Sequence, residues 1–132
     1  MTQHVNGSCH CGKVRFSAEL DPTSGTSRCN CSICLRQRFW KAVVPAAAFK
    51  LDAGADAVRE YTFGGGNIHH FFCTTCGVKA FGRGKVEPIG DFVAVNVVCL
   101  DLSDDQLAAL PVIFQDGAHN RWDRSPDHVG YL

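Results

Sequence analysis

Apolar and polar positions alternate along much of the chain and predict short strands joined by turns. The segment KVRFSAEL, residues 13–20, places apolar side chains at every second position, as a half-buried strand does. Residues 58–63 and 67–72 flank three consecutive glycines, a composition typical of a hairpin. Residues 78–85 alternate again. The composition of residues 21–27, DPTSGTS, predicts a loop before the cysteine-rich segment that follows.

Two further segments depart from this alternation. Residues 92–100, FVAVNVVCL, are apolar on both faces except at Asn96, which predicts a central strand buried on both sides. Residues 103–110 begin with Ser103 and carry Gln106 three positions later, the arrangement of a helical capping box. The fold class that we expect is therefore mainly β, with small antiparallel sheets and one or two short helices.

Length and charge narrow the class of protein. The 132 residues fit one domain spanning residues 1–132. Thirteen basic and thirteen acidic residues give a net charge of zero, which argues against a nucleic-acid binder because such proteins are usually basic. The opening segment MTQHVNGSCHCG lacks the features of a signal peptide, and no apolar stretch is long enough to span a bilayer. We therefore expect a cytoplasmic protein without a membrane partner.

Eight cysteines are the most distinctive feature of the composition. In a reducing compartment they favour metal binding over disulfides, and the missing signal peptide and tight spacing disfavour the alternative of a secreted disulfide framework. In the segment CTTCG, Cys73 and Cys76 have the spacing of a metal knuckle, in which two thiolates turn toward one ion. Gly77 can adopt the positive φ that such a turn often needs. A tetrahedral structural zinc requires two more ligands.

Two groups of cysteines compete to complete this site. Cys9 and Cys11 precede the first strand, and with the knuckle they make a closed four-cysteine cluster. This leaves a cysteine trio formed by Cys29, Cys31 and Cys34. Three protein ligands and one open position are the usual arrangement of a catalytic zinc. The rival partition pairs two members of the trio with the knuckle. Cys99 is then a small core residue or a fourth ligand.

The ligand atoms indicate which metal is bound, and the neighbouring charges affect the thiols of the trio. All-sulfur ligation favours zinc, although iron also suits four cysteines. Cations lower the pKa of a nearby thiol, and four of them surround the trio: Arg28, Arg36, Arg38 and Lys41. They either attract an anionic substrate or only balance the charge of the thiolates. Ser32 is a candidate N-cap for a short helix that carries Cys34.

The chain resembles the glutathione-dependent formaldehyde-activating enzyme family, which also includes centromere protein V. The resemblance covers most of the chain and is carried by the segments GSCHCGKVRF, CNCSICLR, VPAAAFKL, FCTTCGVKAF and VNVVCLD. The joint order CxC, CxCxxC and CxxCG is specific, whereas each motif alone is weak. The chain departs from the family at Asn30, where CHC is common. Bulky side chains also follow the third cysteine, namely Leu35, Gln37, Phe39 and Trp40.

The resemblance implies the zinc-stapled β-tent fold, in which small sheets are held together by a structural zinc. It assigns this zinc to Cys9, Cys11, Cys73 and Cys76. It assigns a second, catalytic-type zinc to the trio, Cys29, Cys31 and Cys34. The activity that it implies is that of a carbon–sulfur lyase, written as the reversible joining of glutathione and formaldehyde into S-hydroxymethylglutathione.

The chemistry that we expect is addition of a thiol to an aldehyde. A zinc with an open position supplies a thiolate or polarises the carbonyl. Arg36 and Arg38 are candidates for binding the carboxylates of glutathione through forked hydrogen bonds. His69 and His70 alternate faces, so only one can point inward, and no histidine is singled out for proton transfer. We expect an enzyme; a non-catalytic module that binds or carries the glutathione adduct and a structural zinc domain for protein recognition are the alternatives.

Overall fold

Short strands dominate the computed structural model of the protein, which describes residues 1–132. The strands are β1 (Gln3–Ser8), β2 (Arg15–Leu20), β3 (Thr26–Cys29), β4 (Trp40–Pro45), β5 (Phe49–Ala53), β6 (Val58–Tyr61), β7 (His69–Cys73), β8 (Lys79–Val86), β9 (Gly90–Asn96) and β10 (Val112–Gln115). The helices are α1 (Ser32–Gln37) and α2 (Asp104–Ala109), with 3-10 turns η1 (Ala46–Ala48), η2 (Val97–Cys99) and η3 (Gly117–His119). The expected mainly β class with short helices is confirmed. None of the helices has the length and apolar character that crossing a membrane requires.

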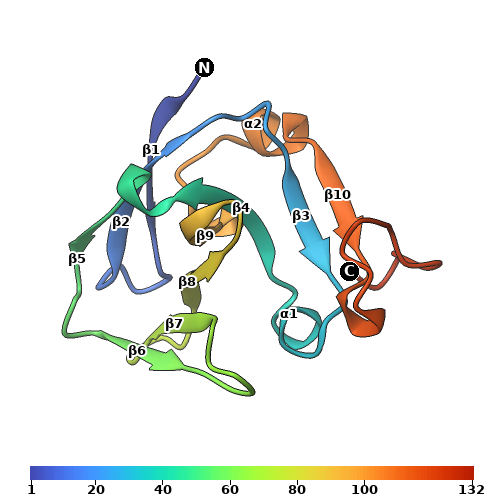
Figure 1. Cartoon of the computed structure of the whole chain (residues 1–132). Coiled ribbons are helices and arrows are strands. Elements are labelled where there is room, and N and C mark those ends of the chain that lie inside the picture. Colours follow the sequence, from blue (N-terminus) through green and yellow to red (C-terminus); the bar gives the residue numbers. More distant parts are fainter.

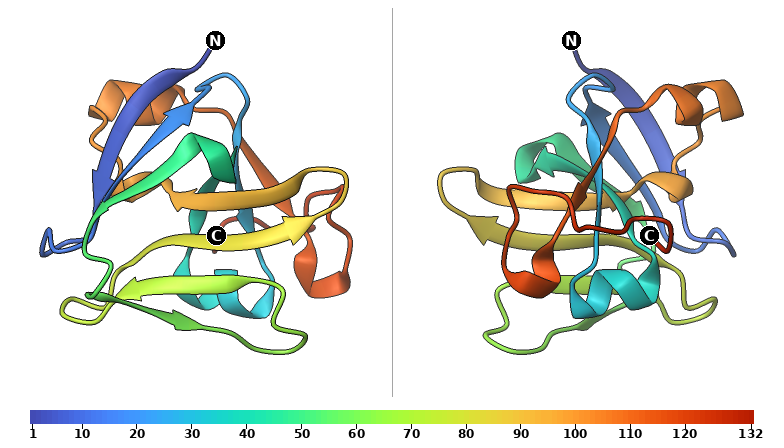
Figure 2. Two further views of the ribbon diagram at one scale, coloured as in Figure 1. Left: turned by 60° about the vertical axis from the view of Figure 1, so that its left-hand side comes forward. Right: turned by 90° about the vertical axis from the view of Figure 1, so that its right-hand side faces the viewer.

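The strands form two sheets, which Figures 1 and 2 show from three directions. The smaller sheet has the order β1-β2-β5, and the larger has the order β10-β3-β4-β9-β8-β7-β6. Neighbouring strands are antiparallel except for β10, which pairs with β3 in parallel. In Figure 1 the smaller sheet lies on the left, β3 and β10 lie on the right, and α1 lies below β3. The larger sheet thus connects α1 and the C-terminal segment with the β6–β7 hairpin.

Aromatic rings fill the core between the two sheets. Phe16 on β2 stacks on Phe49 with ring centroids 5.5 Å apart, and Phe49 lies 4.8 Å from Phe81 on β8. A Cβ atom on Gly7 would lie 2.5 Å from the Phe16 ring, so only glycine lets β1 pack this closely. Truncation of such buried rings to alanine typically destabilises a domain by about 3–5 kcal/mol.

Three of the expected elements are confirmed by the structure. The strand expected within residues 13–20 is β2, and the glycine-flanked segments pair as the antiparallel hairpin of β6 and β7. At α2 the capping box is complete, because the Gln106 backbone N–H donates to Ser103 Oγ at 3.1 Å and the Ser103 N–H donates to Gln106 Oε1 at 2.9 Å. Local sequence signals therefore identify these elements.

Two expectations are wrong in detail. The central strand expected over residues 92–100 is buried on both faces at residues 93–95, but it ends at Asn96, where η2 turns the chain. The Asn96 side chain donates to the Lys79 carbonyl at 2.8 Å, so this polar residue fixes the end of β9 against β8. Ser32 is not the N-cap of α1; Cys31 occupies that position, without a capping side-chain hydrogen bond.

Candidate metal centre

The four-cysteine cluster brings together two segments that are far apart in the sequence. Cys9 and Cys11 follow β1, whereas Cys73 ends β7 and Cys76 lies in the turn before β8. All four sulfur atoms lie within 4.8 Å of one another. The Cys11 sulfur lies 3.6 Å from the sulfurs of both Cys9 and Cys73. The knuckle therefore meets the N-terminal pair, not the trio as in the rival partition.

The two segments reach the cluster through turns of the same kind. In both turns the first cysteine donates its backbone N–H to the carbonyl five residues later, from Cys9 to Val14 and from Cys73 to Val78, at 3.0 Å in each case. Gly77 has the positive φ, 78°, that the CTTCG motif predicts. Each turn consequently presents its cysteine side chains toward the other.

The donor set and its spacing fit a tetrahedral zinc. Sulfur atoms about 2.3 Å from a tetrahedral zinc are separated by about 3.8 Å. The separations of 3.6 Å are close to this value. Backbone N–H groups of Val14 and Thr75 also donate to the sulfurs of Cys9 and Cys73, both at 3.4 Å, and such bonds stabilise the thiolate form. The residues present thus suit a closed, fully ligated site.

The cysteine trio surrounds the start of α1. Cys29 ends β3, Cys31 caps the helix, and the Cys31 N–H donates to Cys29 Sγ at 3.3 Å. Hydrogen bonds from the Cys29 and Cys34 thiols hold the pKa of Cys31 far below the usual thiol value, while hydrogen bonds with Cys29 and Cys31 raise the pKa of Cys34. The trio does not close into a cluster like that of the other four cysteines. Its role as a second metal site stays a prediction.

The Asn30 side chain points away from the trio toward the C-terminal segment. Its Nδ2 donates to Asp116 Oδ1 at 2.8 Å, and its Oδ1 accepts from the Ala118 N–H at 2.9 Å. Asp116 is fully buried and also accepts from Arg121 Nε at 2.9 Å. The departure from a CHC motif therefore has a structural reason: the asparagine fixes the segment around η3 against the end of β3.

The cations near the trio diverge in the structure. Arg36 is one of the residues that line a surface cavity. Arg38 ends α1 with a left-handed φ of 49°, and its Nη2 lies 3.4 Å from the Leu132 carbonyl oxygen. The Arg28 guanidinium stacks over the Trp40 ring at 4.8 Å. Of the two arginines expected to bind substrate, Arg36 lies at a cavity and Arg38 contacts the chain's own C-terminus.

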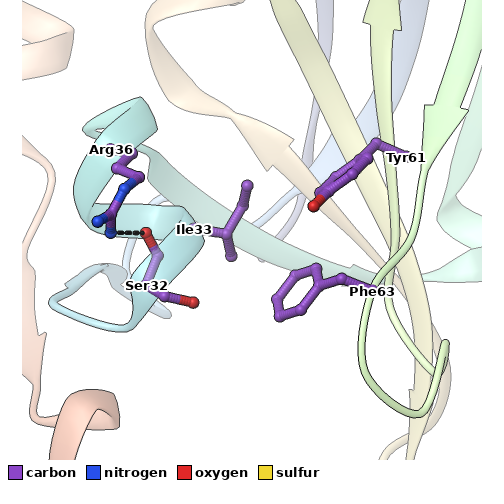
Figure 3. A pocket seen from close by; sticks show the side chains of 5 residues that line it. All are labelled: Ser32, Ile33, Arg36, Tyr61 and Phe63. Atoms are coloured by element: carbon purple, nitrogen blue, oxygen red, sulfur yellow. Dashed lines mark hydrogen bonds between the residues drawn. The ribbon is translucent and has the colours of Figure 1, made fainter.

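The cavity beside α1 has a volume of about 260 Å³, close to the lower end of ligand pockets at about 300 Å³. Figure 3 shows its lining, in which Ile33 of α1 points toward Tyr61 and Phe63, while the Arg36 guanidinium lies beyond Ile33 and turns toward the Ser32 carbonyl. Arg36 Nη1 donates to the Ser32 carbonyl at 3.0 Å, and the guanidinium has no carboxylate partner. Its remaining N–H groups are available to a ligand.

The cavity and the trio occupy neighbouring faces of α1. Residues rotate by about 100° per position in an α-helix, which places Gln37 between Ile33 of the cavity and Cys34 of the trio. Gln37 Oε1 accepts from Lys79 Nζ at 3.1 Å. A ligand that lies in the cavity and extends past Gln37 would therefore reach the thiols.

Of the paired histidines, His70 points inward. It is 5% exposed, whereas His69 hydrogen-bonds Glu60 at the surface at 2.8 Å. Sequence reasoning predicted that one of the two would be buried, but it missed Lys79 and Asp116. Both are charged residues that are ordinarily exposed, so no local signal identified them as buried.

Fold and site together define a small β protein in which two knuckle turns form a candidate metal centre. The chain matches the model of the glutathione-dependent formaldehyde-activating enzyme family over residues 4–116. It belongs to this family, which confirms the resemblance seen in the motifs. The structure is also similar to the crystal structure of a Rhodobacter sphaeroides protein, with a TM-score of 0.69 and 29% sequence identity, covering 82% of this chain and 99% of that chain.

Proposed function

We propose that the protein is a zinc-dependent carbon–sulfur lyase that acts on glutathione–aldehyde adducts, forming or breaking S-hydroxymethylglutathione. Family membership supports glutathione-dependent formaldehyde activation in general. The observation that carries the proposal further is the position of the trio, which adjoins a cavity lined by an arginine without a carboxylate partner. A thiol that carries carboxylates, as glutathione does, matches this arrangement.

The two sets of cysteines have separate roles in this proposal. The four-cysteine cluster holds a structural zinc that ties the N-terminal turn to the β7–β8 turn. The trio holds a second zinc, which when bound promotes thiolate formation or polarises the aldehyde carbonyl. Three protein ligands leave one position for the substrate.

The residues of the cavity bind the part of the substrate that is remote from the sulfur. The Arg36 guanidinium pairs with a glutathione carboxylate through two parallel hydrogen bonds. Tyr61 and Phe63, stacked with ring centroids 5.9 Å apart, cover the backbone of the bound peptide and reduce its contact with water. Together they direct the thiol of the substrate past Gln37 toward the trio.

Metal content and turnover test this function together. We expect freshly purified protein to contain two zinc ions per chain, one of which exchanges when glutathione is added. We also expect the protein to interconvert S-hydroxymethylglutathione with glutathione and formaldehyde faster than the uncatalysed reaction. One tightly held zinc and no acceleration would contradict the proposal and favour a structural zinc domain. Two zincs with tight adduct binding but no acceleration would favour a carrier.

A further inference from the structure

Lys79 is a buried lysine without a carboxylate partner. Its residue is 8% exposed, and no acidic side chain forms an ion pair with it. Nζ donates to Gln37 Oε1 at 3.1 Å and to His70 Nδ1 at 2.8 Å, and it lies 3.8 Å from the centroid of the Phe39 ring. None of these three partners carries a negative charge that would balance the ammonium group. Because an uncompensated buried charge is strongly destabilising, such a lysine calls for an anion.

The anionic groups that act on Lys79 belong to the trio. Burial lowers the pKa of Lys79 to about 8, while the electrostatic influence of the trio, from Cys34 and then Cys31, opposes this effect. Lys79 also contacts Gln37 and Phe39, the residues that follow Cys34 at the end of α1. The ammonium group therefore faces the part of the molecule where the thiol and aldehyde would react.

His70 holds Lys79 from the opposite side. An ammonium group can only donate, so His70 Nδ1 accepts and the ring hydrogen resides on Nε2, which is buried without a partner. Burial and the charge of Lys79 lower the pKa of His70 to about 4, so the ring is neutral at neutral pH. The ring stacks on Phe63 with centroids 5.8 Å apart, and Phe63 lines the cavity. The Lys79–His70 pair thus lies between the cavity and the trio.

A β-bulge places Lys79 on this face of the sheet. Phe71 pairs with Phe81 and Phe72 pairs with Lys79, so Ala80 is an extra residue in β8. Strict alternation would put Lys79 on the same face as Phe81 of the core, but the extra residue moves it to the opposite face. A Cβ atom on Gly82 would lie 3.8 Å from Lys79 Cε, which places the lysine side chain on the same face of the sheet as Gly82 and its partner His70.

We infer that Lys79 is a catalytic residue of the thiol–aldehyde reaction, binding the oxygen of the aldehyde as it becomes an alkoxide and giving it a proton. This inference rests on the proposed function of the trio. His70 is a positioning residue, because its Nδ1 fixes the direction of the ammonium group. Preorganised donors of this kind act where negative charge develops in the transition state.

The proton and electron balance of the step is complete. The sulfur of glutathione attacks the carbonyl carbon, a C–S bond forms, and the electron pair of the C=O π bond moves to the oxygen. Lys79 transfers a proton to that oxygen and becomes a neutral amine. The S–H bond of the attacking glutathione breaks as its thiolate forms, and that proton restores the ammonium group, so each turnover moves one proton from sulfur to oxygen. In the reverse direction the amine takes the hydroxyl proton as the C–S bond breaks.

Turnover of three lysine variants tests the inference. We expect Lys79→Met to lower kcat for S-hydroxymethylglutathione by about 100-fold or more, the usual range for loss of general acid–base catalysis. Lys79→Arg keeps the charge but cannot give up its proton, so kcat should also fall more than tenfold. Lys85→Met, on the same strand at the surface, is the matched control and should retain the kcat of the unaltered protein. A loss below tenfold in the folded Lys79 variants would overturn the inference.

A binding measurement separates this inference from the proposed function. S-carboxymethylglutathione places an anionic oxygen near the position of the alkoxide, whereas S-propylglutathione is neutral there. We expect calorimetry to show at least tenfold tighter binding of the carboxymethyl compound to the unaltered protein. Lys79→Arg should keep this preference and Lys79→Met should lose it. A preference that survives in Lys79→Met, or is absent from the unaltered protein, overturns the inference even if no turnover is found.

The His70→Phe variant tests the positioning role. It retains the stacking on Phe63 but removes the acceptor for Lys79. We expect kcat to fall about tenfold with KM unchanged, because the cavity that binds the substrate is intact. A rise in KM with unchanged kcat would instead assign His70 to substrate binding and exclude it as a positioning residue.

Discussion

The two groups of cysteines use the same ligand atoms in different surroundings. In the four-cysteine cluster, backbone N–H groups of two similar turns donate to sulfur, and the four sulfurs lie within 4.8 Å of one another. Around the trio one backbone N–H, that of Cys31, also donates to sulfur, but the further neighbours are a buried lysine, a buried aspartate network and a cavity. A closed set of four sulfurs suits a structural role, whereas three sulfurs beside polar side chains and a cavity suit reactions with a substrate.

The sharpest way to test this contrast is to remove one sulfur from each group. We expect Cys76→Ser to prevent stable folding, because structural zinc contributes on the order of 10 kcal/mol in small domains. Cys34→Ser should give a folded protein that has lost only the second metal. Thermal denaturation and zinc content should be measured on both variants. Equal loss of folding in the two would contradict a structural role for the four-cysteine cluster and a separate catalytic role for the trio.

The sequence predicts much of the four-cysteine cluster and little of what surrounds the trio. The CTTCG knuckle, its glycine and the capping box of α2 are local patterns, and local hydrogen bonds form them. Lys79 reaches its face through a bulge, which depends on how β7 and β8 pair. Asn30 meets Asp116, 86 residues away. Strand register and long-range partners of this kind leave no periodic signal in a single sequence.

Asp116 should contribute stability near neutral pH and lose it in acid. Hydrogen bonds from Asn30 and His119 lower the pKa of Asp116 to about 2, from an ordinary value of 3.8. A lowered pKa means that the contribution is complete above about pH 4 and disappears as the pH falls toward 2. We therefore expect Asp116→Asn to be clearly less stable than the unaltered protein at pH 6.

Urea denaturation of both proteins at several pH values measures this effect. The difference in unfolding free energy should narrow below pH 4, because the unaltered protein then loses the charge that the variant already lacks. Comparing the two proteins at each pH cancels the effect of acid on metal binding. A difference that stays constant from pH 6 to pH 3 would show that the charge of Asp116 adds nothing to stability.

Asn30→Ala, which alters the contact with Asp116, should lower the stability of the protein less than Asp116→Asn does. It removes one donor to Asp116 and leaves the Ala118 N–H without its acceptor, which costs about 2 kcal/mol for hydrogen bonds of this kind. Zinc bound to the four-cysteine cluster should be unchanged, because Asn30 does not contact it. Urea denaturation gives the stability, and a drop in the structural zinc alone would mean that the two regions are coupled.

The smallest expected effects are those of substituting Arg36 and Arg38, the two arginines that the sequence alone could not distinguish as substrate-binding residues. Arg38 occupies a left-handed conformation at the end of α1, which is unfavourable for any residue except glycine. Arg38→Gly should therefore stabilise the protein by about 0.5 kcal/mol, since relief of strain is partly offset by the greater freedom of glycine in the unfolded chain. Its KM for S-hydroxymethylglutathione should not change, because Arg38 contacts Leu132 and not the cavity.

Arg36→Ala should instead raise the KM for S-hydroxymethylglutathione severalfold and leave the stability of the protein unchanged. If the two variants exchange these effects, the substrate lies on the C-terminal side of α1 and the cavity beside Phe63 does not bind it.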